Sequence, residues 1–115
     1  MFQQDYTFQS RQLTCNKIRD NYPDRIPIIV TPDPKNKKLL LNKTKFLVPL
    51  DLTISIFLSE LRHYLQPLTA DYSLYLLLED KSLPRLTDTC SQIYNKHKNN
   101  DGFLYMTCCQ ENVFG

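Results

Sequence analysis

The chain has 115 residues, of which 42% are hydrophobic, and a net charge of +2, which indicates one soluble globular domain. This charge is too small to favour a nucleic-acid-binding protein, and apolar runs such as residues 74–78 are too short to span a membrane. The first residues lack the basic and apolar layout of a signal peptide. We therefore expect a cytoplasmic protein with no nucleic acid among its partners.

The N-terminal part predicts a helix followed by two strands. Apolar side chains recur at helical spacing over residues 10–21, and a short helical turn is expected before them near Gln3. Branched residues at 25–30 and again at 43–48 predict two strands joined by a rather long charged loop. Pro27 has no N–H group, which suits the first part of a strand or a sheet edge.

The remainder predicts a helix, a strand, a short helix and a final strand. Residues 53–64 have helical spacing, and Thr53 is a suitable N-cap. A strand at 73–78 follows, then a helix that starts at residue 87 or 88, and a last strand at 103–109.

This order of elements predicts an α+β fold, a β-grasp of the ubiquitin kind with a four-stranded mixed sheet. The central helix covers one face of the sheet, and one or two N-terminal helices cover the other. Neighbouring apolar residues in the run Phe46-Leu47-Val48 support two covered faces, because adjacent side chains of a strand point to opposite sides. Within one domain we expect an N-terminal helical extension at 1–24, a core at 25–109 and a C-terminal tail at 110–115.

The four cysteines are expected to be reduced and mostly buried, because their spacing fits neither a metal site nor a redox motif. Cys108 and Cys109 are neighbours on a strand and point to opposite faces. We expect no metal, no cofactor and no enzymatic activity. The alternative is a small thiol enzyme that uses Cys90 or Cys108, with one of the two histidines as the base.

Gly115 is the last residue and one of only two glycines in the chain. It ends the short polar stretch 110–115 that follows the last predicted strand. A terminal glycine has no side chain and wide backbone freedom, which suits a carboxylate that must pass through a narrow channel into another protein's active site. The pattern favours a compact domain that is used as a tag.

Several short segments spread over the chain resemble, in their order, those of the autophagy ubiquitin-like modifiers, the family of GABARAP and microtubule-associated protein light chain 3. The matching segments are Arg25-Ile26-Pro27-Ile28-Ile29, Lys45-Phe46-Leu47-Val48-Pro49, Asp51-Leu52-Thr53, Ile93-Tyr94, His97-Lys98, Asp101-Gly102-Phe103-Leu104-Tyr105 and Phe114-Gly115.

The resemblance implies that Gly115 is joined to the amine of phosphatidylethanolamine on the autophagosome membrane. Activating and conjugating enzymes would carry out the transfer, with Phe114 in the tail that they recognise. A cysteine protease would process and deconjugate the protein. A non-lipidated adaptor with the same peptide-binding groove is the alternative.

The resemblance also implies that the edge strand 45–48 binds aromatic-x-x-aliphatic peptides of autophagy receptors and adaptors, with microtubules as a further candidate partner. The implied aromatic pocket consists of Ile18, Pro27, Ile29, Lys45, Leu47 and Phe103. The implied aliphatic pocket consists of Phe46, Val48, Pro49, Leu52, Phe57, Glu60 and Leu61. Basic residues at the rim that would meet acidic residues beside the motif are Arg25, Lys43 and Arg62.

The chain departs from the family pattern at two residues of the implied pockets, and also at Cys108, which replaces a usual aromatic residue, and over residues 70–82, where it is longer. Glu60 stands where an apolar residue usually lines the aliphatic pocket, and a carboxylate there is costly to bury without a partner. It either turns to solvent or pairs with a basic residue of the peptide. Thr14 stands beside the aromatic pocket, where many members have an acidic residue. Both changes indicate an altered peptide preference.

Overall fold

The computed structural model describes residues 2–35, 39–66 and 72–112. The chain begins with two helices, α1 (Phe2–Asp5) and α2 (Phe8–Asn21), as the sequence predicts. Thr7 caps α2, because its hydroxyl oxygen accepts a hydrogen bond from the Ser10 N–H group. Such a cap satisfies one of the amide groups that a helix leaves unpaired at its start.

The predicted four-stranded mixed sheet is confirmed. Its strands are β1 (Arg25–Pro32), β3 (Lys45–Pro49), β5 (Tyr72–Leu78) and β6 (Leu104–Asn112). Their order is β3-β1-β6-β5, with β1 and β6 parallel and the other two pairs antiparallel. The parallel pair in the middle requires a long crossover, which carries the two remaining helices.

These helices are α3 (Ile54–Leu61), which continues as a 3-10 turn, η1 (Arg62–Tyr64), and α4 (Cys90–His97). The N-cap of α3 is Thr53, as predicted. The predicted start of the last helix at residue 87 or 88 is wrong. Thr89 is its N-cap and forms a capping box with Gln92, in which each side chain bonds the other residue's backbone N–H.

A second, two-stranded sheet was not predicted. It pairs β2 (Leu40–Leu41) with β4 (Leu65–Gln66). Two residues are too few to show the alternation by which a strand is recognised.

The predicted end of the last strand at residue 109 is also wrong, because β6 continues to Asn112. Gln110 pairs with Leu74 and Glu111 pairs with Ser73 on β5. The backbone hydrogen bonds of this long antiparallel pair hold polar residues in the sheet, although their side chains read as a tail.

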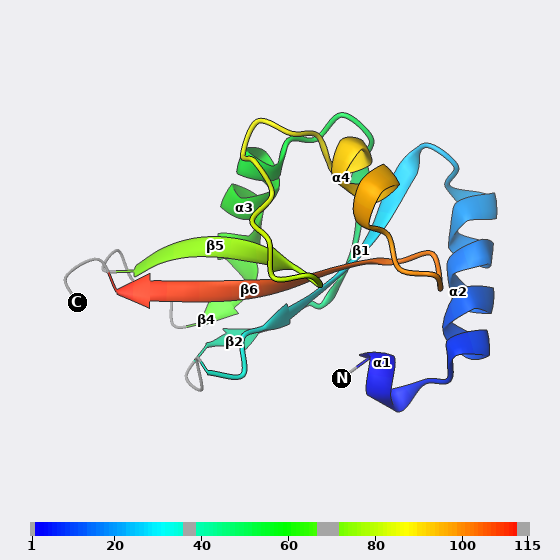
Figure 1. Ribbon diagram of the computed structural model, residues 1–115, viewed down its shortest axis with the longest axis horizontal. Helices are drawn as coiled ribbons and strands as arrows, with labels where there is room; N and C mark the ends of the chain where they lie inside the picture. The colour runs from blue at the N-terminus through cyan, green and yellow to red at the C-terminus, as the bar shows by residue number, and fades with distance from the viewer. Residues whose placement is uncertain (1, 36–38, 67–71, 113–115) are drawn as a thin grey trace.

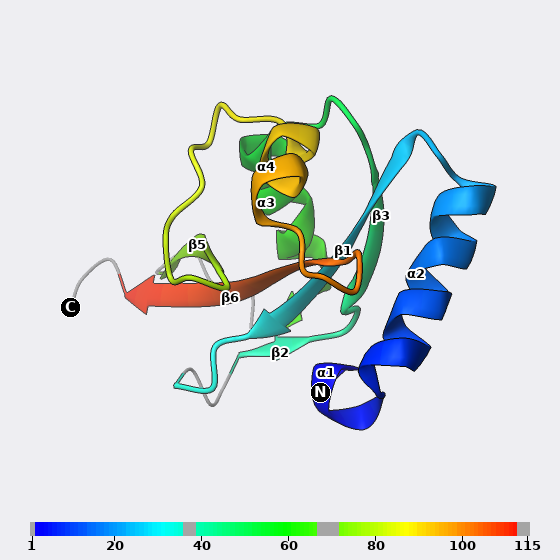
Figure 2. The same ribbon diagram turned by 45° about the vertical axis from the view of Figure 1, so that its right-hand side comes forward.

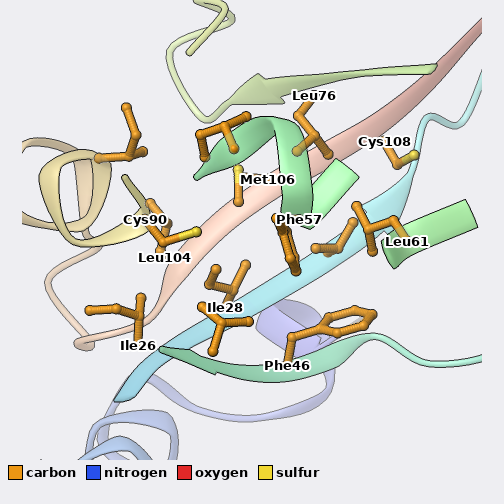
Figure 3. Packing of buried hydrophobic residues seen from close by; sticks show 14 of the residues in the cluster. Ile26, Ile28, Phe46, Phe57, Leu61, Leu76, Cys90, Leu104, Met106 and Cys108 are labelled. Carbon is orange, nitrogen blue, oxygen red and sulfur yellow. The ribbon is translucent and has the colours of Figure 1, made fainter. Parts of the chain in front are cut away.

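The two faces of the sheet carry separate apolar clusters. On one face α3 and α4 contribute to the large core, where Phe57 and Cys90 pack with β1, β3, β5 and β6 (Figure 3). Helices α1 and α2 lie on the other side of the sheet from α3 and α4 (Figures 1 and 2). A smaller second apolar cluster lies on this face. It consists of Cys15, Ile29, Phe103 and Tyr105, with half-buried Phe2 and Ile18 packed against it.

A buried carboxylate fixes α2 to the sheet. Asp101 is 1% exposed and accepts hydrogen bonds from Arg11 Nη1 at 2.7 Å, from the Tyr105 hydroxyl and from the Phe103 N–H group. Both carboxylate oxygens of Asp101 thus have partners, which offsets the cost of a buried charge, whereas Arg11 Nε is buried without a hydrogen-bond partner. Burial, and then the bond to Asp101, raises the pKa of the Tyr105 hydroxyl, which therefore remains a donor at neutral pH.

Gly102 allows α2 to approach the loop before β6. Its φ of +97° is rarely adopted by residues with a side chain, and a Cβ atom there would lie 2.6 Å from the buried Cys15 Sγ. The Tyr94 hydroxyl donates a hydrogen bond to the Gly102 carbonyl at 2.6 Å. The turn is thus fixed both by its backbone conformation and by its contacts.

Replacing Gly102 with alanine is expected to reduce the free energy of unfolding by about 2–4 kcal/mol, from backbone strain and overpacking together. Urea unfolding of Gly102→Ala, Cys15→Ala and the double variant measures both parts. The double variant should be more stable than the sum of the single effects predicts, because removal of Cys15 Sγ relieves the clash. Strictly additive effects would show that the two sites do not interact.

Candidate functional site

Strand β3 lies at the edge of the four-stranded sheet, and within the described residues its ladder partner is β1. The Val30 N–H group donates to the Thr44 carbonyl at 2.8 Å, just before β3 begins. In an antiparallel pair, hydrogen-bonded and non-bonded residue pairs alternate. This one bond therefore determines which residues of β3 bond to β1 and which face outward.

By this alternation Phe46 and Val48 exchange hydrogen bonds with β1, whereas Lys45 and Leu47 direct their N–H and carbonyl groups away from it. Leu47 is opposite Pro27, which has no N–H group to donate. Proline at this position therefore removes no hydrogen bond between β1 and β3. The outer edge of β3 offers two sets of backbone groups to an additional strand.

The residues of the predicted aromatic pocket lie on the α2 side of the sheet. Ile29 and Phe103 are buried in the second cluster, and half-buried Ile18 packs against them from α2. Lys45 is the cross-strand partner of Ile29, and the half-buried Leu47 is that of the buried Pro27. Cross-strand partners have their side chains on the same face, so all six residues share this side.

A pocket of about 490 Å³ opens where this face meets α1. It includes Ile29 and Lys45 from the predicted aromatic pocket, and residues from α1 and the two strand ends. Its lining consists of Phe2, Asp5, Tyr6, Ile29, Thr31, Pro32, Pro34, Thr44 and Lys45. Most of the lining is apolar, so it suits an apolar side chain.

The predicted aliphatic pocket lies on the other side of β3, next to α3. Phe46, Val48, Phe57 and Leu61 are buried in the large core, and the rings of Phe46 and Phe57 meet edge to face at 5.5 Å. Leu52 is half-buried against the core, while Pro49 and Glu60 are exposed. The first four form the floor of this region, and the last three lie at its surface.

Sequence reasoning missed Tyr64, whose ring meets that of Phe46 at 5.5 Å. Lys43 holds its ammonium 5.1 Å from the centre of the Phe46 ring and 5.4 Å from that of Tyr64. Tyr64 follows the buried Leu61 by one helical turn, which is a signal that could have placed it on the same side. Lys43 was predicted only as a basic residue at the rim. In the structure it also contacts the rings of Phe46 and Tyr64.

The other two predicted rim cations differ in exposure. Arg25 is exposed, and its backbone carbonyl accepts a hydrogen bond from Arg19 Nη1 at 2.7 Å. Arg62 is half-buried, and its charge lowers the pKa of Cys108, against the larger opposite effect of burial. Exposed Thr14 donates a hydrogen bond to the Ser10 carbonyl within its own helix.

Phe2 and Tyr6 were also missed as residues of the site, and we call them the N-terminal aromatic pair. Their rings lie 5.2 Å apart, and Phe2 meets Phe103 at 5.2 Å. The residues around these two aromatic side chains are mostly polar and show no apolar periodicity. We therefore did not predict that this segment folds back onto the sheet.

All four cysteines are free and buried. Burial is the main cause that raises the pKa of Cys15 to about 11 and that of Cys90 and Cys108 to about 12. Burial likewise raises the pKa of Cys109. Since the thiolate is the reactive form of cysteine, these environments disfavour a nucleophilic role.

Phe114 and Gly115, the predicted tail residues, lie outside the described residues. None of the helices in the described part of the chain is long and apolar enough to cross a bilayer. The same part contains no group of three or more side chains arranged to hold a metal ion.

Comparison with known proteins gives a consistent result over nearly the whole chain. A family model described as "Autophagy protein Atg8 ubiquitin like" matches residues 10–115. The sequence is 37% identical to Autophagy-related protein 8 of Dictyostelium discoideum and 38% identical to that of Schizosaccharomyces pombe, in each case over 99% of this chain and 93% of the relative.

The structure is similar to the crystal structure of Trypanosoma brucei ATG8. The TM-score is 0.87 at 37% identity, and the match covers 99% of this chain and 97% of that chain. Sequence and structure thus agree over nearly the full length.

Proposed function

The chain belongs to the Atg8 family of ubiquitin-like autophagy proteins, and on this premise we propose that it is a lipid-conjugated modifier with a peptide-binding edge. Its C-terminal Gly115 is joined to phosphatidylethanolamine, which places the protein on the autophagosome membrane. The open edge of β3 meanwhile binds aromatic-x-x-aliphatic segments of autophagy receptors and adaptors. The observation that carries the peptide-binding part is the outer edge of β3, which pairs with no other strand within the described residues and lies between two apolar surfaces.

Peptide binding follows from the alternation along β3. The outward N–H and carbonyl groups of Lys45 and Leu47 hydrogen-bond an extended peptide, which sets its register. The peptide's aromatic residue binds on the face of the sheet that carries Ile29 and Phe103. Its aliphatic residue packs against the surface formed by Leu52 and Pro49. Main-chain bonds supply affinity here, and the two apolar sites supply specificity.

Exposed cations assist the encounter. Arg25, Lys43 and Lys45 are exposed near β3 and attract acidic residues that flank the peptide motif. Exposed ion pairs contribute only about 0–1 kcal/mol each, so they affect association rate more than affinity.

Conjugation uses the chain as a substrate. An activating enzyme joins the Gly115 carboxylate to the AMP part of ATP, which releases pyrophosphate, and its cysteine then displaces AMP to form a thioester. The acyl group passes to the cysteine of a conjugating enzyme, which frees the first thiol. The lipid amine then displaces the second thiol, so that an amide bond forms. The buried thiols of this chain, whose pKa values are raised, support the assignment of the catalytic cysteines to the partner enzymes and the processing protease.

The alternative function is a peptide-binding adaptor that is never joined to lipid. The geometry of β3 supports it equally, because the groove does not depend on the tail. A measurement of lipid conjugation therefore distinguishes the lipid-conjugated modifier from the adaptor.

Incubation with the family's activating and conjugating enzymes, ATP and phosphatidylethanolamine vesicles is expected to add one lipid to the chain, detected by intact-mass spectrometry. Gly115→Ala should reduce the conjugated fraction at least about tenfold. The methyl group of alanine would hinder entry of the terminal carboxylate into the narrow channel of the enzyme, which glycine can pass. Leu47→Ala is the control and should be conjugated like the wild type. Absence of lipid on the wild-type chain would leave the adaptor as the function.

Leu47→Ala is expected to weaken a tryptophan-x-x-leucine peptide about tenfold, as truncation of a central interface residue commonly does. The chain has no tryptophan, so peptide fluorescence reports binding directly. Leu13→Ala, a change at a side chain on α2 that is 63% exposed, serves as the control. Equal affinity of Leu47→Ala and wild type would contradict the groove.

In the same titration Glu60→Val should bind the leucine peptide about threefold more tightly, because it removes the cost of placing a carboxylate beside an apolar side chain. A peptide with a basic residue next to the leucine should lose affinity for Glu60→Val. An unchanged preference between the two peptides would show that Glu60 does not contact the ligand.

A further inference from the structure

The protein's own Phe2 lies against the surface proposed to bind the peptide's aromatic residue. Its half-buried ring meets the Phe103 ring at 5.2 Å with an interplanar angle of 76°. It packs against the second cluster, to which Ile29 also belongs. Phe2 thus contacts the apolar floor that an incoming aromatic side chain requires.

Lys45 connects the same ring to the open edge. Its ammonium lies 4.8 Å from the centre of the Phe2 ring and 5.9 Å from that of Tyr6. A cation over an aromatic face is an attractive arrangement. The N-terminal aromatic pair therefore contacts the side chain of Lys45, whose backbone groups face the proposed peptide.

The segment that carries Phe2 is a short helix at the surface. Helix α1 has four residues, none of them buried, and Gln3 donates one exposed hydrogen bond to Glu79 at 3.2 Å. A helix this short has little stability of its own and depends on its side-chain contacts. Its position is therefore set by side-chain contacts that a competing ligand can replace.

Hollows lie on both sides of Phe2. The pocket of about 490 Å³ lies toward Lys45, and a second of about 190 Å³ lies toward Glu79 and Tyr105. Phe2 and Ile29 line both. Thr31 lines both as well, so Phe2 borders both hollows on the α1 side and β1 borders both on the sheet side.

We propose that Phe2 is an internal ligand of the aromatic pocket and that peptides compete with it. This regulation rests on the proposed peptide-binding function. In the closed form, Phe2 covers Phe103 and the N-terminal aromatic pair holds Lys45. In the open form, α1 withdraws and the aromatic residue of the peptide takes the place of Phe2. When only the open fraction can bind, the measured dissociation constant is the intrinsic value divided by that fraction.

The direct test is titration of a tryptophan-x-x-leucine peptide into wild type, Phe2→Ala and Phe8→Ala, with peptide fluorescence as the readout. Phe2→Ala should bind about three- to tenfold more tightly, because the competing ring is gone. Phe8→Ala is the matched control, since Phe8 is 42% exposed and contacts Arg11 within its own helix. Equal or weaker binding by Phe2→Ala, relative to wild type, would overturn the proposal.

A second measurement does not depend on a variant. Aromatic cross-peaks between the Phe2 and Phe103 rings should be present in the NMR spectrum of the free protein and disappear at peptide saturation. Their persistence in the bound protein would overturn the competition and leave peptide binding intact. If no variant binds the peptide at all, the proposed groove fails, and the inference fails with it.

Discussion

The buried carboxylate of Asp101 is the contact on which the two-sided architecture depends. It joins the N-terminal helix layer to the sheet across 90 residues of sequence through Arg11, and it also binds Tyr105 and the backbone of Phe103. Without α2 in this position, the face of the sheet that carries Ile29 would be open. The apolar surface proposed to receive an aromatic side chain is thus a product of this one polar cluster, with Gly102 allowing the close approach.

Strand β3 both pairs with β1 and presents backbone groups at the sheet edge, because its hydrogen-bonding direction alternates from residue to residue. Phe46 and Val48 bond to β1 and bury their side chains in the core, while Lys45 and Leu47 leave their backbone groups at the edge. Pro27 lies opposite an outward-facing residue, so it weakens neither the ladder nor the edge. Within the described residues the outer edge of β3 is paired with no other strand, so its backbone groups can bind an extended peptide.

Much of the fold could be predicted from the sequence because the helices and the longer strands have clear periodicity. The Thr89 and Gln92 capping box was also readable, although the predicted helix start missed it. Two kinds of feature had no local signal. The two-residue strands β2 and β4 exist only through their pairing, and Asp101 is recognisable as a buried hub only when α2 is in place. The contact of Phe2 with Phe103 likewise joins distant parts of the chain.

The most direct test of the account is amide hydrogen exchange along β3, measured by NMR with and without a saturating aromatic-x-x-aliphatic peptide. In the free protein the amides of Phe46 and Val48 should exchange slowly, and those of Lys45 and Leu47 rapidly, because only the first pair bonds to β1. Peptide addition should slow Lys45 and Leu47 at least about tenfold. Unchanged exchange at both residues in the peptide-bound protein would contradict strand addition at this edge.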